Sequence, residues 1–158
     1  MANGHKYGDC APITPVAVAS ATVIAIGDLI WQDTGASNVP KPAADITWNT
    51  NIATTQEDFH DKFMGVALDA SRSGDTNQIR VATAGVFEFD CASATFKAGD
   101  LVGTAKQTGN AIENQKVVAV ATANLAIGRV EKDYASATTK VLVRIDSVVM
   151  TGGPRAMA

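Results

Sequence analysis

Aromatic residues, cysteines and histidines are all scarce in this chain of 158 residues. Aromatic side chains make up 6% of the sequence, and there are two cysteines and two histidines. The core must therefore be assembled from small and branched side chains, which suits closely packed strands. With no C-x-x-C pair and no histidine at zinc spacing, the sequence predicts no metal site. We interpret Cys10 and Cys91 as two thiols, and the alternative is a disulfide that pins the N-terminal arm.

Clusters of positive charge and long apolar runs are also missing. Lys and Arg number 13 against 16 Asp and Glu, a formal net charge of −3, and the basic residues stand at isolated positions. Affinity for nucleic acid depends mainly on grouped cations that neutralise phosphates, so we expect no direct nucleic-acid partner. No run approaches the roughly 18 apolar residues of a membrane span, and the N-terminus lacks the apolar region of a secretion signal. We therefore expect neither a membrane partner nor export.

Motifs of nucleophilic and phosphate chemistry do not occur in the sequence. There is no G-x-S-x-G, no G-x-x-x-x-G-K-[ST] and no G-x-G-x-x-G. His60 lies beside Glu57, Asp58 and Asp61, which could join it as metal ligands, but acidic residues early in a helix already complement its dipole. An oligomeric hydrolase is supported only by the abundance of Asp and Glu. We expect no enzymatic activity and no cofactor.

One short pattern occurs twice. Residues 25–30 (AIGDLI) return as residues 97–102 (KAGDLV), and each copy is followed by an apolar strand with a glycine, Gly65 or Gly128. Such self-similarity predicts two structurally similar β-units. We interpret Asp28 and Asp100 as turn residues rather than as a catalytic pair, because Asp after Gly caps the backbone of a turn.

A strand with an arginine follows each of these glycines, after 15 residues at Arg80 and after 16 at Arg144. We expect the two arginines to hold equivalent positions in the two units. On an alternating strand, each is predicted to face solvent, and the alternative is a salt bridge between subunits or a contact with a partner surface.

The chain is predicted to be all-β, a barrel or sandwich of eight or more short strands. We divide it into an N-terminal arm (1–11), a single β-barrel domain (12–149) with an insertion at 33–62, and a C-terminal tail (150–158). Within the insertion, Thr54-Thr55-Gln56-Glu57 fits a capping box and predicts one short helix over about 55–63. Expected strands of the second unit include 100–105, 116–122, 126–132 and 141–149.

Several short motifs, in their shared order, resemble those of a known family. They are Gly27-Asp28-Leu29-Ile30, Phe63-Met64-Gly65-Val66-Ala67, Ala84-Gly85-Val86-Phe87-Glu88-Phe89, Ala98-Gly99-Asp100-Leu101-Val102 and Ala126-Ile127-Gly128-Arg129-Val130. In this order the chain resembles the small β-barrel type of capsid decoration (cement) proteins of tailed bacteriophages. The resemblance covers about residues 12–146.

The resemblance implies a structural protein that binds the outside of a phage head and stabilises it by bridging capsomers. Its implied partners are the major capsid protein and further copies of itself, with a trimer slightly favoured over a dimer. It implies a place on the outer surface of the virion after synthesis in the host cytoplasm.

The expected contacts with the capsid or with other copies are made by Tyr7, Trp48, Phe59, Arg80 and Arg144. The alternative function is a carbohydrate-binding or host-adhesion module. Trp31 or Trp48 would then serve as a stacking platform, and Trp48 has the more polar surroundings.

Overall fold

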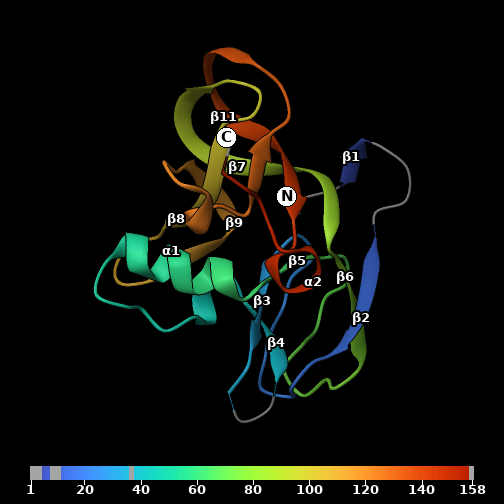
Figure 1. The fold of residues 1–158 in the computed structure, drawn as a ribbon. Coiled ribbons are helices and arrows are strands. Elements are labelled where there is room, and N and C mark those ends of the chain that lie inside the picture. Colours follow the sequence, from blue (N-terminus) through green and yellow to red (C-terminus); the bar gives the residue numbers. More distant parts are fainter. Residues whose placement is uncertain (1–4, 8–11, 36–37, 157–158) are drawn as a thin grey trace.

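A computed structural model of the chain describes residues 5–7, 12–35 and 38–156, and its strands form two sheets (Figure 1). The strands are β1 (His5–Tyr7), β2 (Ile13–Ala17), β3 (Leu29–Asp33), β4 (Val39–Pro42), β5 (Phe63–Ala67), β6 (Gln78–Ala82), β7 (Ala84–Phe96), β8 (Leu101–Lys106), β9 (Ile112–Ala119), β10 (Gly128–Val130) and β11 (Tyr134–Asp146). The α-helices are α1 (Ile52–Asp61) and α2 (Val148–Thr151), and the 3-10 helices are η1 (Ala43–Asp45) and η2 (Ala123–Leu125). The all-β prediction is confirmed.

One sheet closes into a barrel and the other stays open. The larger sheet has the order β1-β7-β11-β10-β8-β9, and β9 also pairs with β7 in parallel, through Asp90 with Lys116 and Cys91 with Val117. That contact completes a five-stranded barrel from β7 to β9. The second sheet has the order β2-β6-β5-β3-β4 and no pairing between its two outer strands.

The two sheets are copies of one design. β2, β6, β5, β3 and β4 of the open sheet match β7, β11, β10, β8 and β9 of the barrel in order and in antiparallel pairing. Register matches as well, because Ile30 pairs with Gly65 in one unit as Val102 pairs with Gly128 in the other. The predicted repeat is therefore real and begins earlier than the Gly-Asp motif, at β2 and β7.

Prolines explain why the first unit does not close. β2 contains Pro15, and β4 contains Pro40 and Pro42, on the two strands that would have to pair. A proline has no backbone N–H to donate to a ladder, so it is confined to sheet edges. β7 and β9, the matching strands of the second unit, contain no proline and pair.

The Gly-Asp turn has the same geometry in both units. In the first, the Ala25 N–H donates to Asp28 Oδ2 at 2.8 Å, and in the second the Lys97 N–H donates to Asp100 Oδ2 at 2.8 Å. Gly27 and Gly99 both have φ of 92°, a conformation that favours glycine. The turn interpretation of both aspartates is confirmed.

The central strands require glycine for a different reason. A Cβ on Gly65 would lie 2.0 Å from the Ala82 carbonyl oxygen, and a Cβ on Gly128 would lie 2.3 Å from that of Arg144. Neither distance is compatible with a side chain. The two glycines of the repeated pattern therefore mark close approach of neighbouring strands.

The arginines are not equivalent, contrary to the sequence prediction. The Leu68 N–H donates to the Arg80 carbonyl, and the corresponding bond of the second unit runs from Glu131 to Leu142. Arg80 thus matches Leu142, and Arg144 matches Ala82. The inward-facing valines Val81 and Val143 are the matched residues of these strands. Arg80 precedes its valine and Arg144 follows its own, so the similar offsets from the glycines do not indicate equivalent positions.

Helix α1 starts earlier than predicted, at Ile52 rather than Thr55. Asn51 is the N-cap, and its side chain accepts from the Thr54 N–H at 3.1 Å while Thr54 Oγ1 accepts from the Asn51 N–H at 3.3 Å. Thr54 therefore closes the capping box as its third residue instead of opening one. An asparagine is as good an N-cap as a threonine, and Asn51 stands only three residues before Thr54.

The boundaries of two other predicted elements also differ. β9 begins at Ile112 rather than 116, and β11 spans Tyr134–Asp146 rather than 141–149. The expected end of that strand is instead helix α2, which Ser147 caps by accepting from the Met150 N–H at 3.1 Å. The early part of β11 is rich in Ala, Ser and Thr, so its strand pattern is weak in the sequence.

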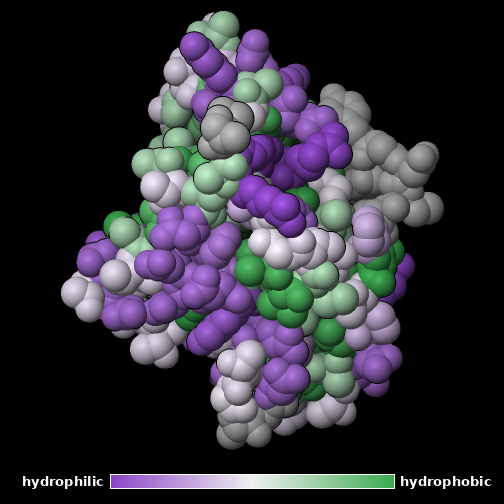
Figure 2. Space-filling view, in the orientation of Figure 1, coloured by the Kyte–Doolittle hydropathy of each residue, from purple (hydrophilic) through white to green (hydrophobic). Residues whose placement is uncertain are grey.

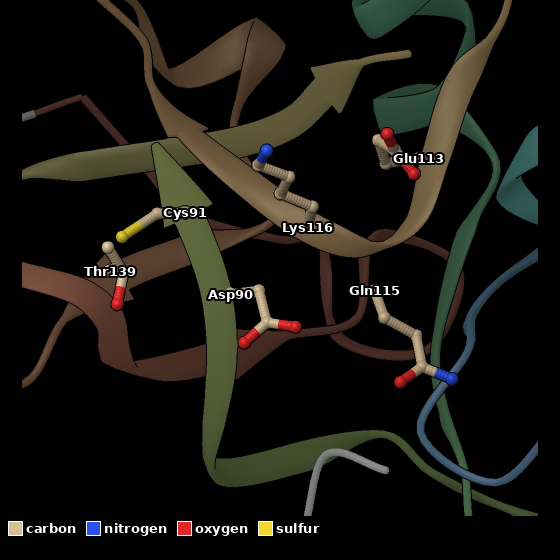
Figure 3. A pocket seen from close by; sticks show the side chains of 6 residues that line it. All are labelled: Asp90, Cys91, Glu113, Gln115, Lys116 and Thr139. Atoms are coloured by element: carbon tan, nitrogen blue, oxygen red, sulfur yellow. The ribbon is translucent and has the colours of Figure 1, made fainter. Parts of the chain in front are cut away.

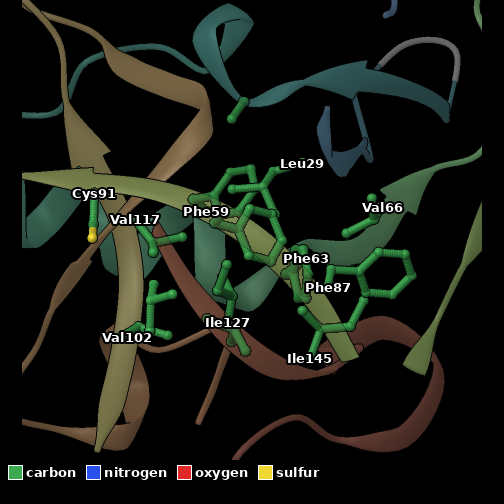
Figure 4. Packing of buried hydrophobic residues seen from close by; sticks show 14 of the residues in the cluster. Leu29, Phe59, Phe63, Val66, Phe87, Cys91, Val102, Val117, Ile127 and Ile145 are labelled. Carbon is green, nitrogen blue, oxygen red and sulfur yellow. The ribbon is translucent and has the colours of Figure 1, made fainter. Parts of the chain in front are cut away.

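The hydrophobic core has two parts. The larger fills the closed barrel and continues into the interface between the units, where Phe59, Phe63 and Phe87 pack (Figure 4). The smaller lies inside the open unit and contains Val18, Ile24, Ile30, Met64, Ala67, Ile79 and Val81. Ala43, Ile46 and Phe59 belong to the larger core, so the segment 33–62 is built into the fold rather than appended to it.

Alanine at either close-contact glycine should destabilise the fold. We expect Gly65→Ala and Gly128→Ala each to lower the free energy of unfolding by roughly 1–3 kcal/mol, because the new methyl group meets backbone that cannot yield. Chemical denaturation followed by circular dichroism measures the change. Gly35→Ala is the control, since its Cβ would meet only the Asp33 side chain, at 3.1 Å. Wild-type stability of Gly128→Ala would contradict the assignment.

Candidate interaction surface

The arginines predicted as contact residues face solvent but are already paired within the chain. Arg80 donates from Nε and Nη2 to Asp69 at 2.9 and 2.7 Å, and Arg144 donates from the same atoms to Glu131 at 2.9 and 2.6 Å. Each arginine side chain is 61% exposed. Each unit thus presents a two-bond ion pair to solvent, which is a nearly neutral surface feature.

The ion pair with Arg80 also changes the pH at which Asp69 titrates. The hydrogen bonds from the Arg80 side chain and from its backbone N–H lower the pKa of Asp69 to about 2. The carboxylate therefore stays charged, and paired, well below the pH at which a free aspartate takes up a proton.

The two tryptophans are not free platforms. Trp31 is buried, and its Nε1–H donates to the Pro42 carbonyl at 3.0 Å. Trp48 is half-buried against the core, and Lys106 Nζ lies 5.0 Å from the centre of its ring. A sugar stacked on Trp48 would have to share or displace that lysine.

Phe59, one of the predicted contact residues, is buried. Phe59 is 1% exposed and packs on Phe63 with 5.6 Å between ring centres, so it has no surface for a capsid contact, and we withdraw it from the contact set. The backbone of Tyr7 pairs with Val86 in β1, and its side chain lies outside the described part of the structure.

His60 is a structural residue. It is buried, and Nδ1 lies 2.6 Å from the Ala126 carbonyl oxygen, which ties α1 to the barrel. Gln56, one turn earlier, donates from Nε2 to the Thr104 carbonyl at 2.7 Å. Among the residues that the structure describes, no group of three or more His, Cys, Asp or Glu could hold a metal ion.

A polar hollow of about 330 Å³ opens where β7 meets β9, lined by Asp90, Cys91, Glu113, Gln115, Lys116 and Thr139. Asp90 and Lys116 point in different directions there, and Asp90 instead binds Lys140 at 2.5 Å (Figure 3). Burial raises the pKa of the Cys91 thiol, which disfavours the reactive thiolate. The disulfide alternative concerns Cys10, which lies outside the described residues.

The exposed large apolar side chains are scattered. Among the residues that the structure describes, they are Ile13, Val23, Ile26, Val118, Val149 and Met150. Figure 2 shows apolar surface over the region of α2, next to a polar surface over α1. Val118 lies instead on the outer face of β9, beside an apolar groove that α1 borders.

The described part of the molecule thus consists of two similar β-units whose arginines predicted as contacts are paired and whose His60 is engaged with backbone. A family model described as phage cement protein matches residues 31–145, so the chain belongs to the phage cement protein family. This family consists of structural proteins associated with the phage capsid. The resemblance noted in the sequence is thus confirmed.

No curated protein matches the chain. Within the described residues, no helix is both long enough and apolar enough to cross a membrane.

Removing the Asp69 carboxylate should lower the melting temperature at neutral pH but have little effect in strong acid. Because the pKa of Asp69 is depressed, the stabilisation by its pair with Arg80 is present above about pH 4 and is lost as the pH falls toward 2. We expect Asp69→Asn to lower the melting temperature at pH 7, and the difference from wild type to shrink as the pH falls from 4 through 2. Arg80→Gln, which breaks the same pair, should show the same convergence. A constant difference across this range would refute the assignment.

Proposed function

We propose that this protein binds the outer surface of a phage head and strengthens the shell by bridging neighbouring capsomers. The family match over residues 31–145 carries the proposal. This range runs from β3 to the end of β11, so it takes in the repeated central strands of both units.

The physical character of the surface supports a passive role. The described ion pairs of Asp33, Asp69, Asp90 and Glu131 hold their carboxylates to lysine or arginine partners, and His60 is engaged with backbone. Bridging two proteins needs area and complementary shape rather than a reactive group. We propose that the protein is not an enzyme and needs no cofactor.

Attachment gains strength from several footprints at once. We propose that the protein associates with itself, as a trimer in preference to a dimer, and that the major capsid protein is its partner. When one subunit is bound, the others are held near their sites at high effective concentration, so modest contacts add up to firm attachment. No contact with nucleic acid is part of the proposal.

Four of the predicted contact residues stay in the proposal. Arg80 and Arg144 would meet a partner as preformed ion pairs, which favours polar contacts at the rim of an interface. Trp48, with Lys106 over its ring, would supply aromatic area. Tyr7 would do the same from β1, the strand that pairs with β7. We also keep the division into an arm (1–11), a barrel domain (12–149) and a tail (150–158) as a proposal.

The direct test adds purified protein to expanded heads from which the decoration protein has been removed. We expect saturable binding and a higher melting temperature of the shell, because the bound protein must dissociate before capsomers separate. Occupancy on heads is measured by sedimentation and shell melting by calorimetry. Heads that retain their decoration protein are the control and should bind little more. Absence of binding at near-physiological salt would refute the proposal.

Self-association is tested separately. Analytical ultracentrifugation of the purified protein should give a mass three times that of the 16.4 kDa chain. A mass that stays at one chain over the accessible concentration range would contradict self-association before attachment.

A further inference from the structure

An apolar groove runs between helix α1 and strand β9. It has a volume of about 540 Å³, and apolar side chains from α1, β7, β8, β9 and η2 make up most of its lining. Its floor is the end of β9 and the residue that follows it, where Lys116, Val118 and Val120 occupy every second position. Ile52 and Gln56, one turn apart on α1, form a wall.

The charged side chains that line the groove are both positive. Lys106 and Lys116 line it, and no carboxylate does, although the chain as a whole has a net charge of −3. The described ion pairs use other cations, namely Lys41, Arg80, Lys140 and Arg144. The groove therefore complements an occupant that carries negative charge beside apolar side chains.

A strand edge opens beside the same groove. The parallel pairing of β9 with β7 consists of Asp90 with Lys116 and Cys91 with Val117, whereas β9 continues to Ala119. β8 pairs with β9 up to Ala119 on the opposite side. The last residues of β9 thus have a neighbouring strand on one side, and an extended peptide can add on the other.

We propose that this groove receives an extended, acidic segment of the capsid surface, which adds to the edge of β9 and places apolar side chains against Val118. The inference rests on the proposed attachment to the head and names the surface that makes it. Carboxylates of the segment would lie near Lys106 and Lys116.

The test compares two valines of equal exposure. Val118 is 39% exposed in the groove and Val149 is 40% exposed on α2, outside it. Val118→Asp puts a carboxylate into the apolar floor, next to the acidic occupant, so we expect at least about tenfold weaker binding to depleted heads. Val149→Asp should bind like wild type. Circular dichroism and melting temperature establish that both variants are folded.

A second pair of variants removes one positive charge each, inside and outside the groove. Lys116→Gln should weaken binding severalfold and make it less sensitive to salt, because one attractive charge is lost. Lys132→Gln, outside the groove and beside Tyr134, is the control and should leave both the affinity and its salt dependence unchanged.

The outcomes separate the two proposals. If wild-type protein binds heads and both groove variants bind equally well, the groove assignment is wrong while the proposed function stands. If wild-type protein does not bind, the proposed function itself fails and takes the assignment with it. If Val118→Asp changes the mass found in ultracentrifugation, the occupant is a second copy of the chain, which overturns the assignment to the capsid.

Discussion

Two hydrogen bonds tie each Gly-Asp turn to the central strand of its unit, and the remaining geometry depends on them. Gly27 donates to the Ala67 carbonyl and the Ala67 N–H donates to Asp28, while Gly99 and Asp100 bind Val130 in the same way. Because these bonds fix the position of the turn on the central strand, they also fix the direction of the hairpin that follows the turn. In the second unit that hairpin is β8 and β9, so this local contact also determines where the groove lies.

The parts of the fold that sequence reasoning predicted are those with local causes. A tight turn needs a glycine with positive φ and an aspartate that accepts a backbone N–H, so the Gly-Asp motif marks both turns. Gly65 and Gly128 could be paired because each follows its Gly-Asp turn within an apolar strand. The composition indicated strands, and the order of the short motifs indicated the family. A helix in the insertion followed from capping chemistry, although its N-cap is Asn51 rather than Thr54.

What the sequence could not reveal depends on contacts between distant segments. The match of β2 with β7 is hidden because the two strands share almost no residues, and only their neighbours identify them. The parallel contact of β7 with β9 involves two residue pairs and leaves no periodic signal. Phe59 was predicted to contact the capsid or another copy, but α1 packs against the barrel and buries it. The groove has no motif at all, since five elements contribute its lining.

The prolines of β2 and β4 have a consequence for the proposed attachment to a phage head. Copies of a capsid-bound protein stand side by side at very high local concentration, where bare sheet edges would recruit one another into aggregates. Pro15, Pro40 and Pro42 withhold N–H donors from two such edges. If the protein attaches to a phage head as proposed, these edges would stay inert toward neighbouring copies.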